Sequence, residues 1–341
     1  MKFDSYSGAI TAKSTDSSVA PSEVISALGL QKIVLPNAEA VLEGDYQRLG
    51  EDLLLISPDG EVTLIKDYFS GDPIPIVTQG GAVLPGDLVA ALAGPIAPGQ
   101  FVQLDSELDE SPIGMVETVL GDAAATRVDG TTYSLDVGSP VYQGDVIETH
   151  DGSAVGIVFI DESTFSFGED ARMVIDELIF DPSSGVGSSA FSIVQGVFVF
   201  VSGEIAENNS GDMLVRTPVA TIGIRGTKVG GRAAQEGEYN TITLMPEESG
   251  AVGQISVTND SGSTVLNTAF QTTTVSSVFE APAAPTTISP AQAGLLFSGV
   301  NRVLQQASQS SESRKQDNQD GPKASDTSEA APAQSGQNTA V

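Results

Sequence analysis

The chain has 341 residues, enough for roughly two domains and for a sizeable buried core. It contains no Cys and a single His, His150, which excludes disulfides, thiolate metal sites, two-His metal sites and a Cys nucleophile. Its 15 basic and 45 acidic residues give a net charge of −30, so the chain would repel nucleic acid. Most familiar enzyme chemistry is therefore unsupported by the sequence. We therefore predict a protein that is not an enzyme and has no cofactor.

The acidity has two explanations, solubility in a salt- or calcium-rich medium or dedicated Ca²⁺ sites. The nearest approach to a calcium loop, Asp105–Glu110, lacks the central Gly of an EF-hand, so we favour the first explanation and predict no metal site. No apolar run approaches the roughly 18 residues of a membrane span, and residues 1–22 lack the apolar segment of a signal peptide. We expect neither a transmembrane segment nor Sec export.

The N-terminal part is predicted to be a flexible leader, a small β module and a linker. Residues 1–22 are rich in Ser, Thr and Ala without periodicity. Within 23–81, Pro58-Asp59-Gly60 separates two aliphatic runs, which indicates a hairpin because Pro and Gly suit the turn. Residues 82–113 are rich in Pro, Gly and Ala, which is typical of a linker, with one short helix near 88–93.

Residues 114–280 are predicted to form a larger all-β domain. Short runs of Val, Ile, Phe, Thr and Tyr recur about every ten residues between turn signals, without a helical pattern. This pattern fits a β-sandwich or a short β-solenoid. The run Gly196–Val201 does not alternate between polar and apolar residues, so we expect it to be buried on both faces.

The C-terminal part is predicted to hold one helix and a disordered tail. Ser289-Pro290 provides an N-cap and a first helical residue, and apolar residues then recur at three- and four-residue steps over 288–307. This amphipathic helix docks on the β domain or on a partner, and we favour docking within the chain. Residues 308–340 contain no Val, Ile, Leu, Met or aromatic residue, so 308–341 is predicted to be disordered.

Two motifs in the larger domain resemble the FecR-type domain of bacteria. The first is the turn G-S-P-V-Y-Q-G-D-V-I-E-T at Gly138–Thr149, followed by an apolar strand and the acidic turn Phe159–Ser163. The second is R-T-P-V-A-T-I-G-I-R-G-T at Arg216–Thr227, preceded by Gln195–Val201. We assign structural roles in these motifs to Gly144, Asp145, Thr217, Pro218, Gly226 and Thr227.

The resemblance implies two possible functions. The FecR family is named for a periplasmic regulator that passes a signal to a sigma factor through a cytoplasmic helix and a membrane span, neither of which is visible in this sequence. Similar domains also occur near the front of large secreted bacterial repeat proteins, and residues 64–69 resemble the prefix segment of type I secreted adhesins. We predict a binding or scaffolding protein at the cell surface or secreted by a signal-peptide-independent type I route. The alternative is a FecR-type signal-transduction protein that regulates a sigma factor without a membrane anchor, in the cytoplasm.

A basic cluster interrupts the acidic sequence. No acid lies between Asp212 and Glu236, a span that includes four basic residues, which we assign to partner binding: Arg216, Arg225, Lys228 and Arg232. The partner would be an unknown protein or an acidic glycan. For Arg225 a structural role is favoured, with its guanidinium bridging strand ends.

We assign no catalytic residue. Neighbouring carboxylates such as Asp176 and Glu177 would point to opposite faces of a strand and could not flank one bond. His150 precedes Asp151-Gly152 and has the pattern of an exposed turn residue. The sequence leaves the oligomeric state open.

Overall fold

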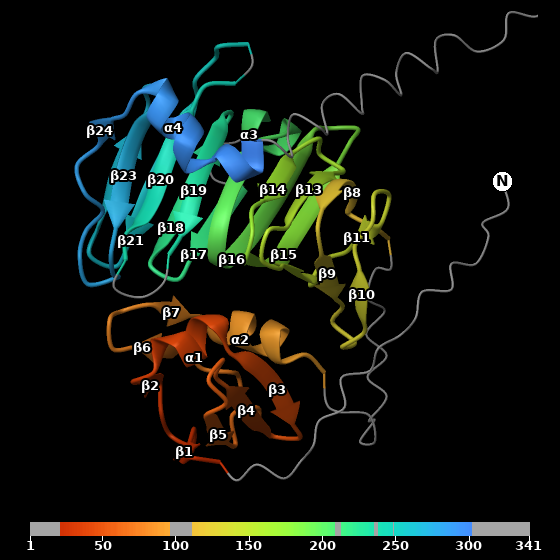
Figure 1. Cartoon of the computed structure of the whole chain (residues 1–341), viewed down its shortest axis with the longest axis vertical. Helices are drawn as coiled ribbons and strands as arrows, with labels where there is room; N and C mark the ends of the chain where they lie inside the picture. Colours follow the sequence, from red (N-terminus) through yellow and green to blue (C-terminus); the bar gives the residue numbers. More distant parts are fainter. Residues whose placement is uncertain (1–20, 96–110, 209–212, 235–237, 248, 302–341) are drawn as a thin grey trace, which may run out of the picture.

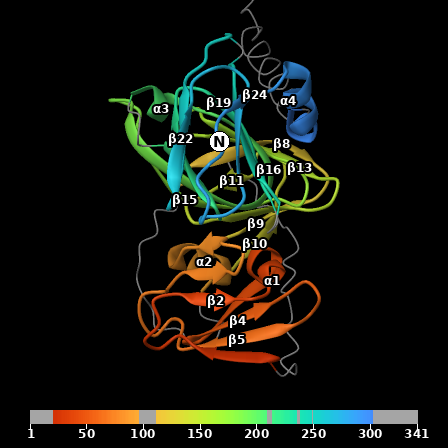
Figure 2. The ribbon, with the colours of Figure 1, turned by 90° about the vertical axis from the view of Figure 1, so that its left-hand side faces the viewer.

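The computed structural model describes residues 21–95, 111–208, 213–234, 238–247 and 249–301 (Figure 1). The described chain is mostly β-strand, as predicted, and consists of an N-terminal module below a larger two-sheet domain (Figures 1 and 2). The leader residues 1–20, the linker residues 96–110, residues 302–307 of the expected helix and the tail lie outside the described residues.

The N-terminal module contains two small sheets and two helices. A four-stranded sheet has the order β1-β5-β4-β3, and a three-stranded sheet has the order β2-β6-β7. Gly60 adopts a φ of 88° in the turn between β4 and β5, which confirms the predicted hairpin. The elements are β1 (Glu23–Ser26), β2 (Ile33–Leu35), α1 (Ala38–Glu43), β3 (Asp45–Leu49), β4 (Asp52–Ile56), β5 (Val62–Lys66), β6 (Ile76–Thr78), β7 (Val83–Leu84) and α2 (Gly86–Ala93).

The start of the expected linker is part of this module. Residues 83–93 form β7 and α2, whose Leu84, Leu88 and Val89 are buried. Composition was misleading here because Pro85 and Gly94 flank the helix, at its N-cap and C-cap. The short helix itself agrees with the expectation from the sequence.

The larger domain is a β-sandwich whose two sheets share one long strand, β16. Sheet I has the order β10-β9-β12-β15-β16-β17-β18-β21-β22. Sheet II has the order β11-β8-β13-β14-β16-β19-β20-β23-β24. The first half of β16 pairs within sheet I and its second half pairs within sheet II.

The strands of the sandwich and the remaining helices follow in chain order: β8 (Gly114–Leu120), β9 (Ala123–Thr126), β10 (Thr132–Ser134), β11 (Pro140–Val141), β12 (Val146–Thr149), β13 (Ala154–Phe159), β14 (Thr164–Phe167), β15 (Arg172–Asp181), β16 (Val186–Val201), α3 (Glu204–Asn208), β17 (Met213–Thr217), β18 (Ala220–Arg225), β19 (Lys228–Ala233), β20 (Asn240–Met245), β21 (Gln254–Asn259), β22 (Gly262–Leu266), β23 (Gln271–Val275), β24 (Thr286–Thr287) and α4 (Pro290–Leu296).

Aromatic side chains fill the space between the two sheets. The ring of Phe191, on the sheet I half of β16, lies 5.1 Å from the ring of Phe165 in sheet II. Phe198, Val199 and Phe200 are all 0% exposed, which confirms that this part of β16 is buried on both faces. Large aromatic side chains contribute much of the buried apolar area, so these contacts are central to the stability of the sandwich.

Helix α4 covers the outer face of sheet II. It begins with a capping box at Ser289 and with Pro290 in its first turn, as the sequence predicts. Phe297, just after the helix, and Val300 pack with Val199 of β16 in a separate apolar cluster. Docking within the chain is therefore what the structure shows for this segment.

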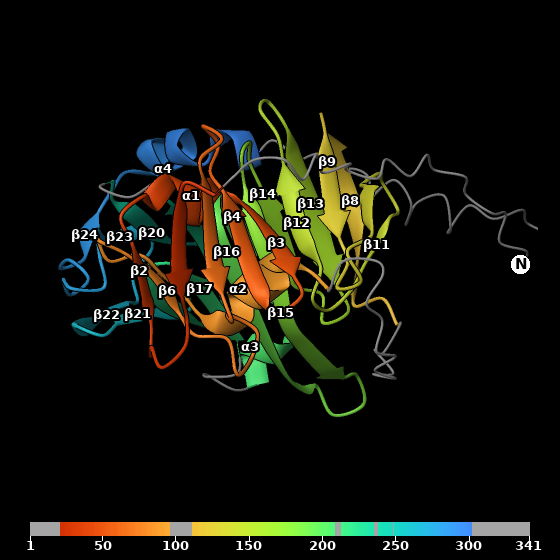
Figure 3. The same ribbon diagram turned by 90° about the horizontal axis from the view of Figure 1, so that it is seen from below.

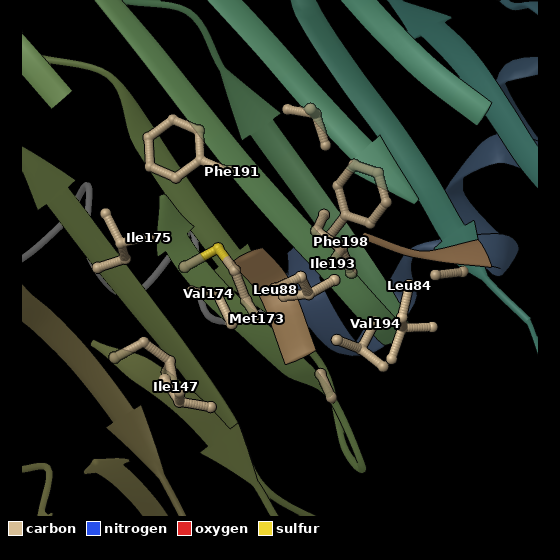
Figure 4. Packing of buried hydrophobic residues seen from close by; sticks show 14 of the residues in the cluster. Leu84, Leu88, Ile147, Met173, Val174, Ile175, Phe191, Ile193, Val194 and Phe198 are labelled. Carbon is tan, nitrogen blue, oxygen red and sulfur yellow. The ribbon is translucent and has the colours of Figure 1, made fainter. Parts of the chain in front are cut away.

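The N-terminal module docks on the outer face of sheet I. The Val83 N–H donates to the Pro218 carbonyl at 2.7 Å, and an Arg172 Nη1–H donates to the Gly44 carbonyl at 2.9 Å. Leu84 lies beside Val194 (Figure 4), and α2 packs against β15 (Figure 3). The buried residues of the module and the sandwich form one continuous apolar cluster, so the two parts share a core.

Candidate functional site

The Gly144–Asp145 turn builds a buried polar cluster. Gly144 has a φ of 81°, and Asp145 is 0% exposed. Asp145 Oδ2 accepts hydrogen bonds from the Tyr142 N–H at 2.9 Å and from the Tyr133 hydroxyl at 3.1 Å. Arg127 Nε lies 3.1 Å from Asp145 Oδ1 but is not aligned for a hydrogen bond, so this contact is purely electrostatic.

Burial dominates the electrostatics of this cluster. It raises the pKa of Asp145 to about 6, against the opposing effects of the Tyr142 N–H and the Arg127 charge. The Arg127 guanidinium stacks 3.6 Å from the centre of the Tyr142 ring. Every group in the cluster contacts another member of it, so we attribute a structural role to Asp145.

The motif at 216–227 forms β17, a tight turn and β18. Thr217 Oγ1 closes the turn through contacts of 3.2 Å with the N–H and the carbonyl of Ala220. The Pro218 carbonyl accepts the hydrogen bond from the N-terminal module described above. Gly226 has a φ of 50°, and no atom would contact a Cβ there, so backbone conformation rather than space favours glycine. Thr227 is fully buried and donates to the Met245 carbonyl.

A cleft of about 250 Å³ lies where the module meets this motif. Arg216 contributes its one cation, and Arg216 Nη1 is 3.2 Å from Asp176 Oδ2, which also accepts from the Ser192 hydroxyl at 2.7 Å. Burial raises the pKa of Asp176, and the nearby Asp87 on α2 raises it further. The lining residues are Val83, Pro85, Leu88, Ser192, Ile193, Arg216, Thr217, Pro218, Val219, Ala220, Thr221, Thr258, Asn259, Asp260 and Val278.

The four basic residues assigned to partner binding do not form one surface. Arg216 and Arg225 lie on the outer face of sheet I, because the alternate residues of their strands are buried. Lys228 and Arg232 lie on the outer face of sheet II, on either side of Gly230, which faces Phe297. The β18–β19 connection crosses from one sheet to the other. These residues are therefore close in sequence but lie on opposite sides of the sandwich.

The structural role expected for Arg225 is wrong. Its side chain is exposed, since Ile222 and Ile224 point inward and alternation places Arg225 outward. Each other described arginine has an ion pair or a cation–π contact, and Arg225 has neither. Arg232, in contrast, pairs with Glu238 at 2.6 Å. The alternation of apolar and other residues over Ile222–Arg225 predicts this exposure.

The expectation that Asp176 and Glu177 point to opposite faces of their strand is also wrong. β15 bulges between Ile175 and Glu177, so one extra residue stands opposite β16. Asp176 therefore accepts from Ser192 and Glu177 Oε1 accepts from Ser188, two residues of the same face of β16. Nothing in the local sequence marks the bulge.

Asp161 is a second buried carboxylate that the sequence did not indicate. It is 0% exposed, Oδ1 accepts from the N–H and the hydroxyl of Ser163, and Oδ2 has no hydrogen-bond partner. Burial raises its pKa. Among the described residues, no group of three or more His, Asp or Glu side chains is placed to hold a metal ion.

A family model described as FecR protein matches residues 145–245, which span β12 to β20 and include the end of the first motif, from Asp145, and all of the second. Residues 145–245 form a FecR domain. The resemblance of the two motifs is thereby confirmed, and a bacterial origin is supported. The FecR domain supplies the central strands of both sheets and the turn on which the N-terminal module docks.

The solved structures that match include two crystal structures of a candidate anti-sigma factor from Parabacteroides distasonis ATCC 8503, at 1.65 and 2.50 Å resolution. Each is 14% identical to this chain with a TM-score of 0.34. The matches cover 43% and 44% of this chain and 62% and 63% of those chains, less than two thirds of their length. No curated protein matches the sequence. None of the helices in the described ranges has the length and apolar character of a membrane span.

Proposed function

We propose that the chain is a signal-transduction protein of the FecR type, which regulates a sigma factor by binding protein partners and not by catalysis. The observation that carries this proposal is the FecR match over residues 145–245. The competing function is the binding or scaffolding protein at the cell surface, which FecR-type domains in secreted repeat proteins also suggest.

Arg225 is the proposed point of partner contact. Its guanidinium is exposed on the outer face of sheet I and has no described acid beside it, in a chain with a net charge of −30. An arginine without an internal partner retains its full set of donors for a carboxylate of another protein. Arg232 is less suited to this role because Glu238 already neutralises it.

The proposal is tested by measuring the binding of the full chain to each sigma factor of its native host. We expect one sigma factor to bind, Arg225→Glu to weaken binding at least about tenfold, and Arg232→Glu to have little effect. Arg232 is the matched control because it is a cation of the same basic cluster on the opposite outer face.

Fractionation of the host distinguishes this proposal from its competitor. A cell-surface or secreted chain that binds no sigma factor would support the binding or scaffolding protein exported by a type I route. A chain found in the cytoplasm and bound to a sigma factor would support the signalling protein.

A further inference from the structure

Strand β1 is an open edge of the N-terminal module. It pairs in parallel with β5, and it has no second strand partner among the described residues. None of its four side chains is fully buried. An edge of this kind presents unpaired N–H and C=O groups that can pair with a strand of another chain.

Apolar side chains are exposed next to this edge. Val24 is 53% exposed on β1, and Leu28 is 67% and Leu30 is 46% exposed in the following turn. Figure 1 shows β1 at the end of the module that is farthest from the sandwich. Exposed apolar residues gathered in one short segment typically mark a protein contact.

The charge of the segment indicates which protein covers it. Residues 22–35 contain one acid, Glu23, and one base, Lys32, whereas the whole chain has a net charge of −30. A surface that contacts the same surface of a second copy across a two-fold axis cannot carry a strong net charge. Like charges of the two copies would lie close together there and repel each other. A basic partner would instead be attracted to the acidic remainder of the surface.

We propose that two copies of the chain associate through β1, which pairs antiparallel with β1 of the second copy. The two four-stranded sheets then become one continuous sheet across a two-fold axis. This inference is independent of the proposed signalling function and holds for either location of the protein.

The faces of the sheet restrict the register of the pair. Ile25 lies opposite Ile65, which is fully buried, so Ile25 is on the core side of the sheet, whereas Val24 is on the outer side. Residues that face each other in an antiparallel pair share a side, so Ile25 opposite Ile25 of the second copy continues the apolar row of Ile65. In this register Glu23 lies opposite Ala27 of the second copy, and no like charges face each other.

Sedimentation equilibrium of the full chain between about 1 and 100 µM tests the proposal, because dimer formation depends on concentration. We expect the wild type to reach twice the 35.1 kDa mass of the chain. Val24→Glu places two acids near the two-fold axis and should raise the dimer dissociation constant at least about tenfold. The matched control is Val265→Glu, an exposed valine on the edge strand β22 of sheet I, which should leave the dissociation constant unchanged. Thermal unfolding of both variants establishes that each is folded.

Three results would overturn the proposal. One is a wild type that remains a monomer at about 100 µM. Another is an equal dimer dissociation constant for Val24→Glu and Val265→Glu. The dimer contact would then lie elsewhere, or any added negative charge would weaken the dimer. The third is a monomer that dimerises only after removal of residues 1–20, because the edge would then be covered by the chain's own leader. Binding to a sigma factor is measured separately, so a failure here is not confused with a failure of the signalling proposal.

Discussion

The buried carboxylate of Asp145 makes the stability of the protein depend on pH in a direction opposite to that of an exposed ion pair. Its pKa is about 6 in the folded state and 3.8 as the ordinary value. Because the folded pKa is raised, this group favours folding fully below about pH 4, and the contribution is lost as pH rises through about 6. A difference of about two units corresponds to at most about 3 kcal/mol, reached only when the pH changes from well below 3.8 to well above 6.

Urea unfolding between about pH 4 and 7.5, followed by circular dichroism, measures this effect. We expect the free energy of unfolding of the wild type to fall over that range, and Asp145→Asn to remove about 2 kcal/mol of the fall. Asp161 and Asp176, whose pKa values are also raised, contribute in the same direction, so the difference between wild type and variant isolates Asp145.

The exposed Asp136→Asn is the control, and its pH dependence should match the wild type. The reasoning would be refuted if Asp145→Asn kept the wild-type slope. It would also be refuted if carbon-detected NMR gave Asp145 a pKa below 4.

Four further substitutions test the packing and the faces of the sandwich by urea unfolding at neutral pH. Arg225→Ala should cost less than about 0.5 kcal/mol, whereas Arg216→Ala should cost about 1 kcal/mol because it leaves a half-buried carboxylate without its cation; the reverse order would contradict the assigned faces. Gly231→Ala should cost about 1–3 kcal/mol, since a Cβ there would lie 2.1 Å from the Phe198 ring, and a neutral result would mean that the sheets separate easily. Phe297→Ala should cost about 3 kcal/mol and increase proteolysis after α4, and unchanged protease resistance would show that the helix does not depend on this anchor.

The sequence predicted those features that depend on local residues. Pro58-Asp59-Gly60 gave the hairpin, the apolar run of β16 gave burial on both faces, and Ser289-Pro290 gave the start of α4. In each case the residues at the position themselves impose the turn, the burial or the cap. The turn at Gly144 and Asp145 was recognised for the same reason.

Features that depend on distant pairing were not predictable. The basic residues of 216–232 lie on two faces because β18 pairs in sheet I and β19 in sheet II, which only the register of β16 decides. The bulge at Asp176 has no local signal and depends on the fit between β15 and β16. The docking of β7 on the carbonyl of Pro218 joins residues far apart in the chain, so composition suggested a linker there.

Because β16 belongs to both sheets, we expect the two sheets to form together during folding. Neither sheet can be completed until this strand has paired with strands that lie between residues 164 and 233, so much of the pairing is between distant parts of the chain. Folding dominated by such long-range contacts is slow, on the order of milliseconds to seconds. We expect no stable intermediate in which only one of the two sheets has formed. A cut or a new terminus placed within β16 would interrupt both layers at once, whereas the same cut in the β20–β21 turn would leave each layer whole.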